Sequence, residues 1–115
     1  MSDNYERDMA LSLVEAIFII NDLTEEKLEM SNGHEKTEQF IIENELSLRE
    51  IAATIKSISA DDYIKGPIPD DKENWRRKKP VWIFKKTYEG LTLYIKLKIF
   101  INNKHVYVVS MHEDE

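Results

Sequence analysis

Four polar side chains in the last quarter of the chain have types and spacing suited to acid–base chemistry. Tyr94, Lys96 and Lys98 alternate with aliphatic residues, so in an extended strand they share one face. His112 follows them, and a histidine titrates near neutral pH and can act as an acid or a base. The lysines supply positive charge and the tyrosine supplies a hydroxyl group. We therefore expect any chemistry to lie on the polar face of this strand.

Whether His112 joins that face depends on the turn near residues 102–104. A three-residue loop pairs Lys96 with Ser110 and Tyr94 with His112, so that all four side chains share the polar face. A two-residue turn slips the pairing by one residue and moves His112 to the aliphatic face. Because a charged histidine is implausible in a core, an active His112 requires the longer loop.

The strands that position these residues are predicted to form an antiparallel meander at 80–112. Three strand-like runs are separated by turn residues at 89–90 and 102–103. The turn at 89–90 permits more than one register, so the face of Lys86 stays open. The middle run carries an aliphatic stripe typical of a core face, made of Leu91, Leu93, Ile95, Leu97, Ile99 and Ile101.

The helices expected to cover that stripe precede it in the chain. Apolar residues at helical spacing predict one helix over about 3–22 and a second over about 35–45. Ser47 and Glu50 fit a capping box, which predicts a third helix that ends near residue 59.

The segment 60–79 is predicted to be a long loop without regular structure, because it contains Gly66, Pro67 and Pro69. Loops of this length are more often functional than merely connective. Its charged second half holds three candidate contacts for an anionic partner, namely Trp75, Arg76 and Arg77.

Length and order of elements predict one α+β domain over 1–115. Its parts are a helical region at about 3–59, the loop at 60–79 and the meander at 80–112. We expect the helices to pack on one face of an antiparallel sheet of three strands, or slightly more. The acidic N-terminus lacks the basic region of a signal peptide and no apolar run spans a bilayer, so a cytoplasmic protein without membrane association is expected.

Charge and composition limit which partners and cofactors the chain can be expected to bind. The net charge is −6, but residues 1–60 hold 13 acidic against 5 basic side chains, while the remainder is slightly basic. This balance argues against strong non-specific nucleic-acid binding and leaves room for a local basic face. The chain has no cysteine, and its histidines and aspartates lack metal-ligand spacing. We therefore expect no metal and no cofactor.

Four linked motifs resemble the family of MqsR-type (motility quorum-sensing regulator) toxins, over about 47–112. They are Asp62-Tyr63 followed by Gly66-Pro67, then Trp82-x-Phe84-x-Lys86, then Tyr94-Ile95-Lys96-Leu97, and last Ser110-x-His112. The resemblance implies a RelE-like α+β fold and a metal-independent endoribonuclease that cleaves mRNA and is neutralised by an antitoxin protein.

Residues carried over from that resemblance form a candidate site. Its catalytic members are Lys86, Tyr94, Lys96 and His112. Candidate RNA-binding residues around them are Lys85, Lys98, Trp75, Arg76 and Arg77. Metal-free RNA cleavage needs a base for the 2′-hydroxyl, an acid for the leaving 5′-oxygen and cations that stabilise charge on phosphorus.

Departures from the family pattern favour an alternative function. Lys85 stands where the family usually has glycine, Met111 where an aromatic is usual, and the acidic end after His112 lacks the usual tail. The alternative is a non-catalytic acidic protein of a mobile element or phage, which binds and blocks a partner protein. A third and weaker hypothesis is an antitoxin or dimerising regulator, but the sequence has no helix-turn-helix or ribbon signature to support it.

Overall fold

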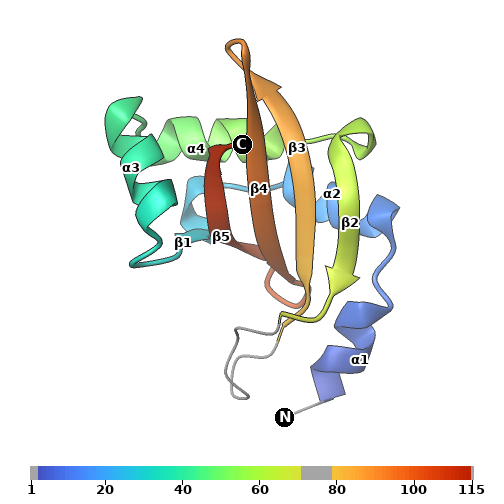
Figure 1. The fold of residues 1–115 in the computed structure, drawn as a ribbon. Helices are drawn as coiled ribbons and strands as arrows, with labels where there is room; N and C mark the ends of the chain where they lie inside the picture. The colour runs from blue at the N-terminus through green and yellow to red at the C-terminus, as the bar shows by residue number, and fades with distance from the viewer. Residues whose placement is uncertain (1–2, 71–78, 115) are drawn as a thin grey trace.

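The computed structural model of the 115-residue chain describes residues 3–70 and 79–114. Its elements form an α+β arrangement in which the helices come first and most of the sheet comes last, as predicted. Figure 1 shows α2 and α4 behind the sheet, α3 beside the edge at β5, and α1 at the end of the sheet where β2 finishes.

The N-terminal helical segment consists of two helices, α1 (Asp3–Met9) and α2 (Leu13–Asn21), so the prediction of one helix over 3–22 was wrong. Ser12 separates them, because its extended backbone starts α2 and its side chain accepts a hydrogen bond from the Glu15 N–H. Glu15 in turn accepts from the Ser12 N–H at 3.0 Å. This capping box satisfies two helix-end donors and begins α2 at this point.

The two later helices agree with the prediction more closely. The second predicted helix is α3 (Glu35–Glu43), and the third is α4 (Leu48–Lys56). The capping box predicted for α4 is present, since the Ser47 N–H donates to Glu50 at 2.9 Å and the Glu50 N–H donates to the Ser47 hydroxyl at 3.1 Å.

The predicted meander is present as β3 (Val81–Tyr88), β4 (Leu91–Phe100) and β5 (His105–Glu113). Two further strands extend it to five, in the order β1-β5-β4-β3-β2. The short strand β1 (Leu28–Met30) runs parallel to β5, which makes the sheet mixed.

The fifth strand, β2 (Tyr63–Ile68), lies inside the segment predicted to be an irregular loop, so that part of the prediction was wrong. Pro67 is tolerated because β2 is an edge strand, and the pairing with β3 shifts register twice along its length. Gly66 has a φ of +134° and lies tightly against the backbone of Trp82.

The hydrophobic core lies between the sheet and the pair α2 and α4. The aliphatic stripe of β4 faces this core, and Leu93, Ile95 and Leu97 are fully buried there. Apolar residues of α2 and α4 meet them, including Ile20 and Ile55. Burial of such side chains contributes about 1.5–3 kcal/mol each, so this interface orients the sheet and leaves its other face outside the core. Within the described ranges, no helix is long and apolar enough to cross a bilayer.

The hairpin between β4 and β5 changes register along its length. Next to its turn, Phe100 pairs with His105 and Leu97 pairs with Val108. This is the register that a two-residue turn gives. Val109 is then an extra residue in β5, a β-bulge, and beyond it Lys96 pairs with Ser110. The bulge therefore produces the pairing that a three-residue loop was predicted to produce.

Candidate functional site

The sheet face that points away from α2 and α4, here called the second face, collects most of the predicted site. Across the strands, His112, Tyr94 and Lys85 form one row, since Tyr94 pairs with both of the others. Lys96 lies in the next row and pairs with Ser110. Tyr94, Lys96 and His112 are each half-buried, so they are fixed by neighbours and still reach solvent.

Three aromatic rings stack side by side along the first row. The His112 ring lies 5.4 Å from the Tyr94 ring, with an interplanar angle of 27°. On its other side lies the ring of His34, at 5.8 Å and 10°. The His112 ring therefore has one ring neighbour in β4 and another at the start of α3, and it stays half-buried.

The hydrogen bonds of His112 define its neutral tautomer. Its Nδ1 lies 3.0 Å from the carbonyl oxygen of Glu113, which can only accept, so Nδ1 carries the proton. Nε2 is then the nitrogen with an available lone pair. His112 also lines a groove of about 210 Å³ between α3 and the end of β5, together with Lys36, Gln39, Phe40, Glu43 and Glu113.

His34 carries the opposite tautomer. Its Nδ1 accepts from the Thr37 N–H at 3.3 Å, and so caps the start of α3. The proton is therefore on Nε2, which donates to the Ser110 hydroxyl at 3.1 Å. No role for His34 was predicted from the sequence, because His34 lies more than 70 residues from Ser110 and an imidazole is an unusual helix cap.

The phenol of Tyr94 is a hydrogen-bond donor at neutral pH. Burial is the main cause that raises its pKa above the ordinary value of 10.0, the nearby carboxylate of Asp114 raises it further, and Lys85 opposes them. Lys85 forms an ion pair with Asp114 at 3.0 Å and remains substantially exposed. The row thus offers a hydroxyl donor beside a partly neutralised cation.

Lys86, a predicted catalytic residue, does not belong to this group. It pairs with Leu93, which points into the core, so its side chain leaves the sheet on the face opposite Lys96. There it forms an ion pair with Asp62 at 3.8 Å. The structure therefore does not bring Lys86 together with the other predicted catalytic residues, and Lys85 lies on the second face instead.

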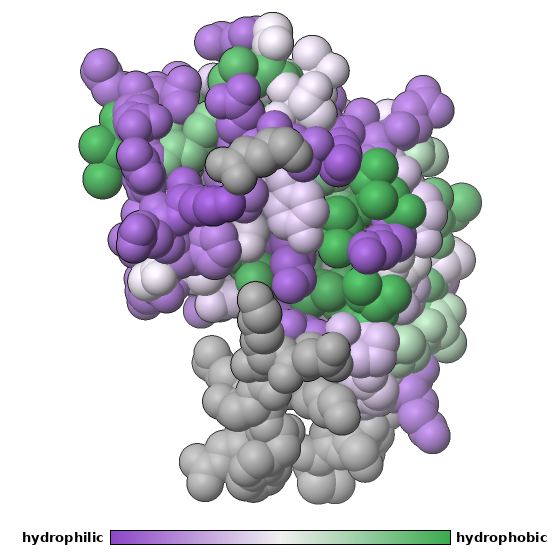
Figure 2. Space-filling model, in the orientation of Figure 1, coloured by the Kyte–Doolittle hydropathy of each residue, from purple (hydrophilic) through white to green (hydrophobic). Residues whose placement is uncertain are grey.

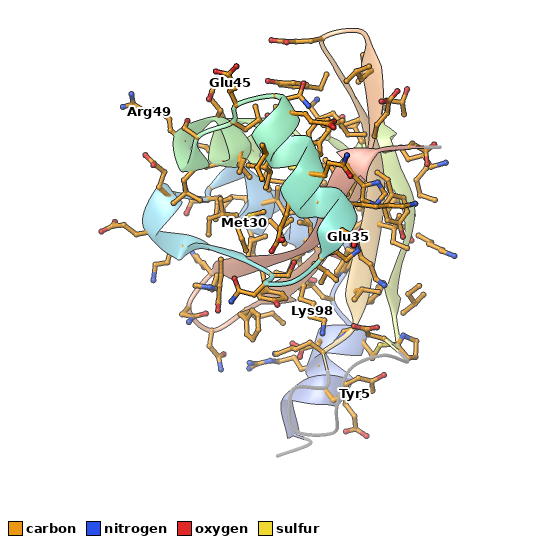
Figure 3. All side chains as sticks on the ribbon, turned by 60° about the vertical axis from the view of Figure 1, so that its left-hand side comes forward. Tyr5, Met30, Glu35, Glu45, Arg49 and Lys98 are labelled. Carbon is orange, nitrogen blue, oxygen red and sulfur yellow. The ribbon has the colours of Figure 1, made fainter. Side chains whose placement is uncertain are left out.

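Lys98, a predicted RNA contact, points to the second face but is not exposed. Its ammonium lies 3.2 Å from Asp70, and both side chains are almost completely buried. Figure 3 shows Lys98 at the end of the sheet next to α1, the helix that carries Tyr5. This lysine is a structural cation rather than a surface one. The other predicted contacts Trp75, Arg76 and Arg77 lie outside the described residues.

Figure 2 looks onto the second face, where hydrophilic side chains gather over α3 and an apolar patch covers β2 and β3. Ile83 of β3 pairs with Lys96 and so lies on this face, where it is buried, whereas Ile64 of β2 is 47% exposed. Among residues 3–70 and 79–114, no group of three histidine, aspartate or glutamate side chains has an arrangement that could hold a metal ion.

Comparison with family models, curated proteins and solved structures found no match to this chain.

Proposed function

We propose that the chain is a metal-independent endoribonuclease that cleaves mRNA at the second face, as the toxin component of a toxin–antitoxin pair. One observation carries the proposal. His112 lies on the exposed side of the sheet with its Nε2 able to accept a proton, and it stands beside the Tyr94 hydroxyl in the row next to Lys96. A base, a neutral donor and a cation are the groups that phosphodiester cleavage by the adjacent 2′-hydroxyl requires.

In this mechanism, His112 Nε2 removes the proton of the RNA 2′-hydroxyl. The 2′-oxygen attacks phosphorus, the bond from phosphorus to the 5′-oxygen breaks, and a 2′,3′-cyclic phosphate forms. The leaving 5′-oxygen takes a proton, so that the second product ends in a 5′-hydroxyl. Atoms and charges balance with no oxidant, metal or water in this step.

Three other side chains act on the phosphate and the leaving group. The raised pKa of Tyr94 makes it a poor acid, so its hydroxyl donates a hydrogen bond to a phosphate oxygen and keeps its own proton. Lys96 neutralises the charge that develops on phosphorus and gives the proton to the leaving oxygen. Lys85 orients the phosphate, and its ion pair with Asp114 limits its contribution.

A purified chain free of any partner tests the proposal. It is incubated in EDTA with a labelled RNA and with the same RNA carrying 2′-deoxy sugars. Fragments with 2′,3′-cyclic phosphate ends from the first substrate, and none from the second, are expected. Intact RNA, or equal cleavage of the deoxy substrate, would reject the mechanism.

A second candidate function is a binding protein that blocks a partner. It is favoured by exposed apolar side chains on the acidic N-terminal region, where Val14 is 79% and Phe18 67% exposed on one side of α2. If the chain leaves RNA intact, a pull-down that depends on these two side chains would support this function. Recovery unaffected by Val14→Ser and Phe18→Ser would count against it.

A further inference from the structure

We infer that His34 is a positioning residue for His112, acting through the bulge in β5. The consequence for catalysis rests on the function proposed above, whereas the consequence for the placement of His112 does not.

The bulge at Val109 determines which face His112 occupies. Without the extra residue, the register next to the turn would continue, Lys96 would pair with Val109, and His112 would point toward the core opposite Leu93. Met111, which is fully buried, would then point outward. The ladder without the bulge is the more regular one, so other contacts must favour the bulged form.

Those contacts come from Ser31, His34 and Thr37, here called the β5 clamp. The strand β1 pairs with β5 only as far as Val108, so the next residues of β5 have an uncovered edge. The β5 clamp forms hydrogen bonds with the backbone polar groups of that edge. The Ser31 hydroxyl donates to the Val109 carbonyl at 2.9 Å, and the Met111 N–H donates to the Thr37 hydroxyl at 2.9 Å.

His34 connects this edge to the second face. Thr37 Oγ1, which accepts from Met111, lies 2.8 Å from His34 Nδ1 and donates to it. The opposite nitrogen of His34 donates to Ser110, the residue that follows the bulge. The ring itself stacks on His112. One imidazole thus links the helix start, the bulge and the proposed base.

The two histidines differ in which ring nitrogens are already hydrogen-bonded. Both nitrogens of His34 are engaged, one as acceptor of the α3 cap and one as donor to Ser110. The Nε2 of His112 points to no described partner that would hold it. His34 therefore orients, and His112 exchanges the proton.

The variant His34→Asn keeps the cap of α3 but removes the contacts that position His112. Asparagine is among the best helix N-caps, so it can still accept from the Thr37 N–H. It has no ring to stack on His112 and is too short to reach Ser110. His105→Asn is the matched control, because His105 also bridges two elements through its bond to Glu29 at 2.9 Å but lies at the other end of β5.

The readout is the nitrogen-15 NMR spectrum of the histidine rings in the free, full-length protein, with melting temperature and cleavage kinetics. We expect His34→Asn to fold but to melt below the unsubstituted chain, because the buried Ser110 hydroxyl loses its donor, and to change the Nδ1 and Nε2 signals of His112. Contacts between the rings of His112 and Tyr94 should weaken, and kcat should fall between about tenfold and 100-fold with little change in KM. His105→Asn should leave the His112 signals and kcat as they were.

Unchanged His112 signals and ring contacts in His34→Asn would overturn the inference. If that variant does not fold, Ser110→Ala decides the question, because it removes the bond to His34 Nε2 and leaves the α3 cap intact. A chain that cuts no RNA would defeat the proposed function, and the NMR comparison would still decide the positioning role. A chain that cuts RNA with equal kcat in both variants would defeat the positioning role alone.

Discussion

Two lysines of the meander, Lys86 and Lys96, carry the same charge but occupy opposite faces of the sheet. The difference follows from the turn at Glu89 and Gly90, where both residues have positive φ and Tyr88 pairs directly with Leu91. Every later pair of β3 and β4 follows from that turn. For single residues, strand register and not residue type therefore determines which lysine lies on the second face.

The buried cation Lys98 should matter for stability. Lys98→Met leaves the Asp70 carboxylate buried without the ammonium that lies 3.2 Å from it, and loss of one member of a buried pair typically costs about 3–5 kcal/mol. Urea unfolding should show a loss of this size. Lys27→Met, at an exposed position, should change the unfolding free energy by less than about 0.5 kcal/mol. Equal effects of the two changes would refute the structural role of Lys98.

Among the elements, the edge strand β2 depends on one glycine. A Cβ added at Gly66 would lie 2.8 Å from both Trp82 Cα and the Val81 carbonyl oxygen, and its φ of +134° disfavours other residues. Gly66→Ala should therefore destabilise the fold by more than about 3 kcal/mol. Gly33→Ala is the control, because its φ is also positive but no atom lies within 4 Å, and it should cost about 1–2 kcal/mol. Thermal unfolding measures both, and a smaller loss at Gly66 would contradict the close approach of β2 and β3.

The capping boxes of α2 and α4 should make stability depend on acid pH. Hydrogen bonds from Ser47 lower the pKa of Glu50 below its ordinary value of 4.5, and Ser12 does the same for Glu15. A lowered pKa in the folded state adds stability above that ordinary value, which is lost as pH falls through the folded pKa.

Glu50→Gln is the variant that tests this linkage. It should be less stable than the unsubstituted chain at pH 7, and the difference should shrink below about pH 4. Denaturant melts across this range measure it, with Glu26→Gln as an exposed control. A difference independent of pH would show that the carboxylate charge is not involved.

Local signals in the sequence predicted much of the fold. The alternation in β4 and the capping box at Ser47 depend only on neighbouring residues, and both are present in the structure. The bulge at Val109 depends on the β5 clamp, whose residues are more than 70 positions away. Periodicity alone cannot detect such a contact. The candidate face could therefore be predicted from the sequence, but the role of His34 could not. The strand β2 was also missed, because an edge strand with register shifts tolerates the glycine and proline that usually signal a loop.

For the molecule as a whole, the acidic net charge limits how RNA can bind under the proposed function. Its net charge is −6, so RNA binding should rely on a few phosphate contacts near the second face. For single strands, log K changes with log salt by about −0.7 per contact. Contacts from Lys85, Lys96, Arg76 and Arg77 predict a slope of about −3.

The double variant Arg76→Gln with Arg77→Gln tests the share of the predicted RNA contacts outside the described residues. Its slope should be about −1.4, as expected for two remaining contacts. Arg49→Gln is the control, because Figure 3 shows Arg49 at the start of α4, away from Lys98 and α1. Binding titrations at several salt concentrations give the slopes. An unchanged slope in the double variant would remove these arginines from the interface.

The most direct test of the nuclease proposal is RNA cleavage by four forms of the chain, namely the unsubstituted protein, His112→Ala, Lys96→Met and Lys86→Met. We predict that His112→Ala and Lys96→Met each lose at least about 100-fold in rate, in line with general acid–base catalysis. Added imidazole should restore part of the activity of His112→Ala, and Lys86→Met, on the opposite face, should cut nearly as well as the unsubstituted chain. Cleavage that survives loss of His112, or that Lys86→Met abolishes as fully as Lys96→Met, would contradict the assignment of the site to the second face.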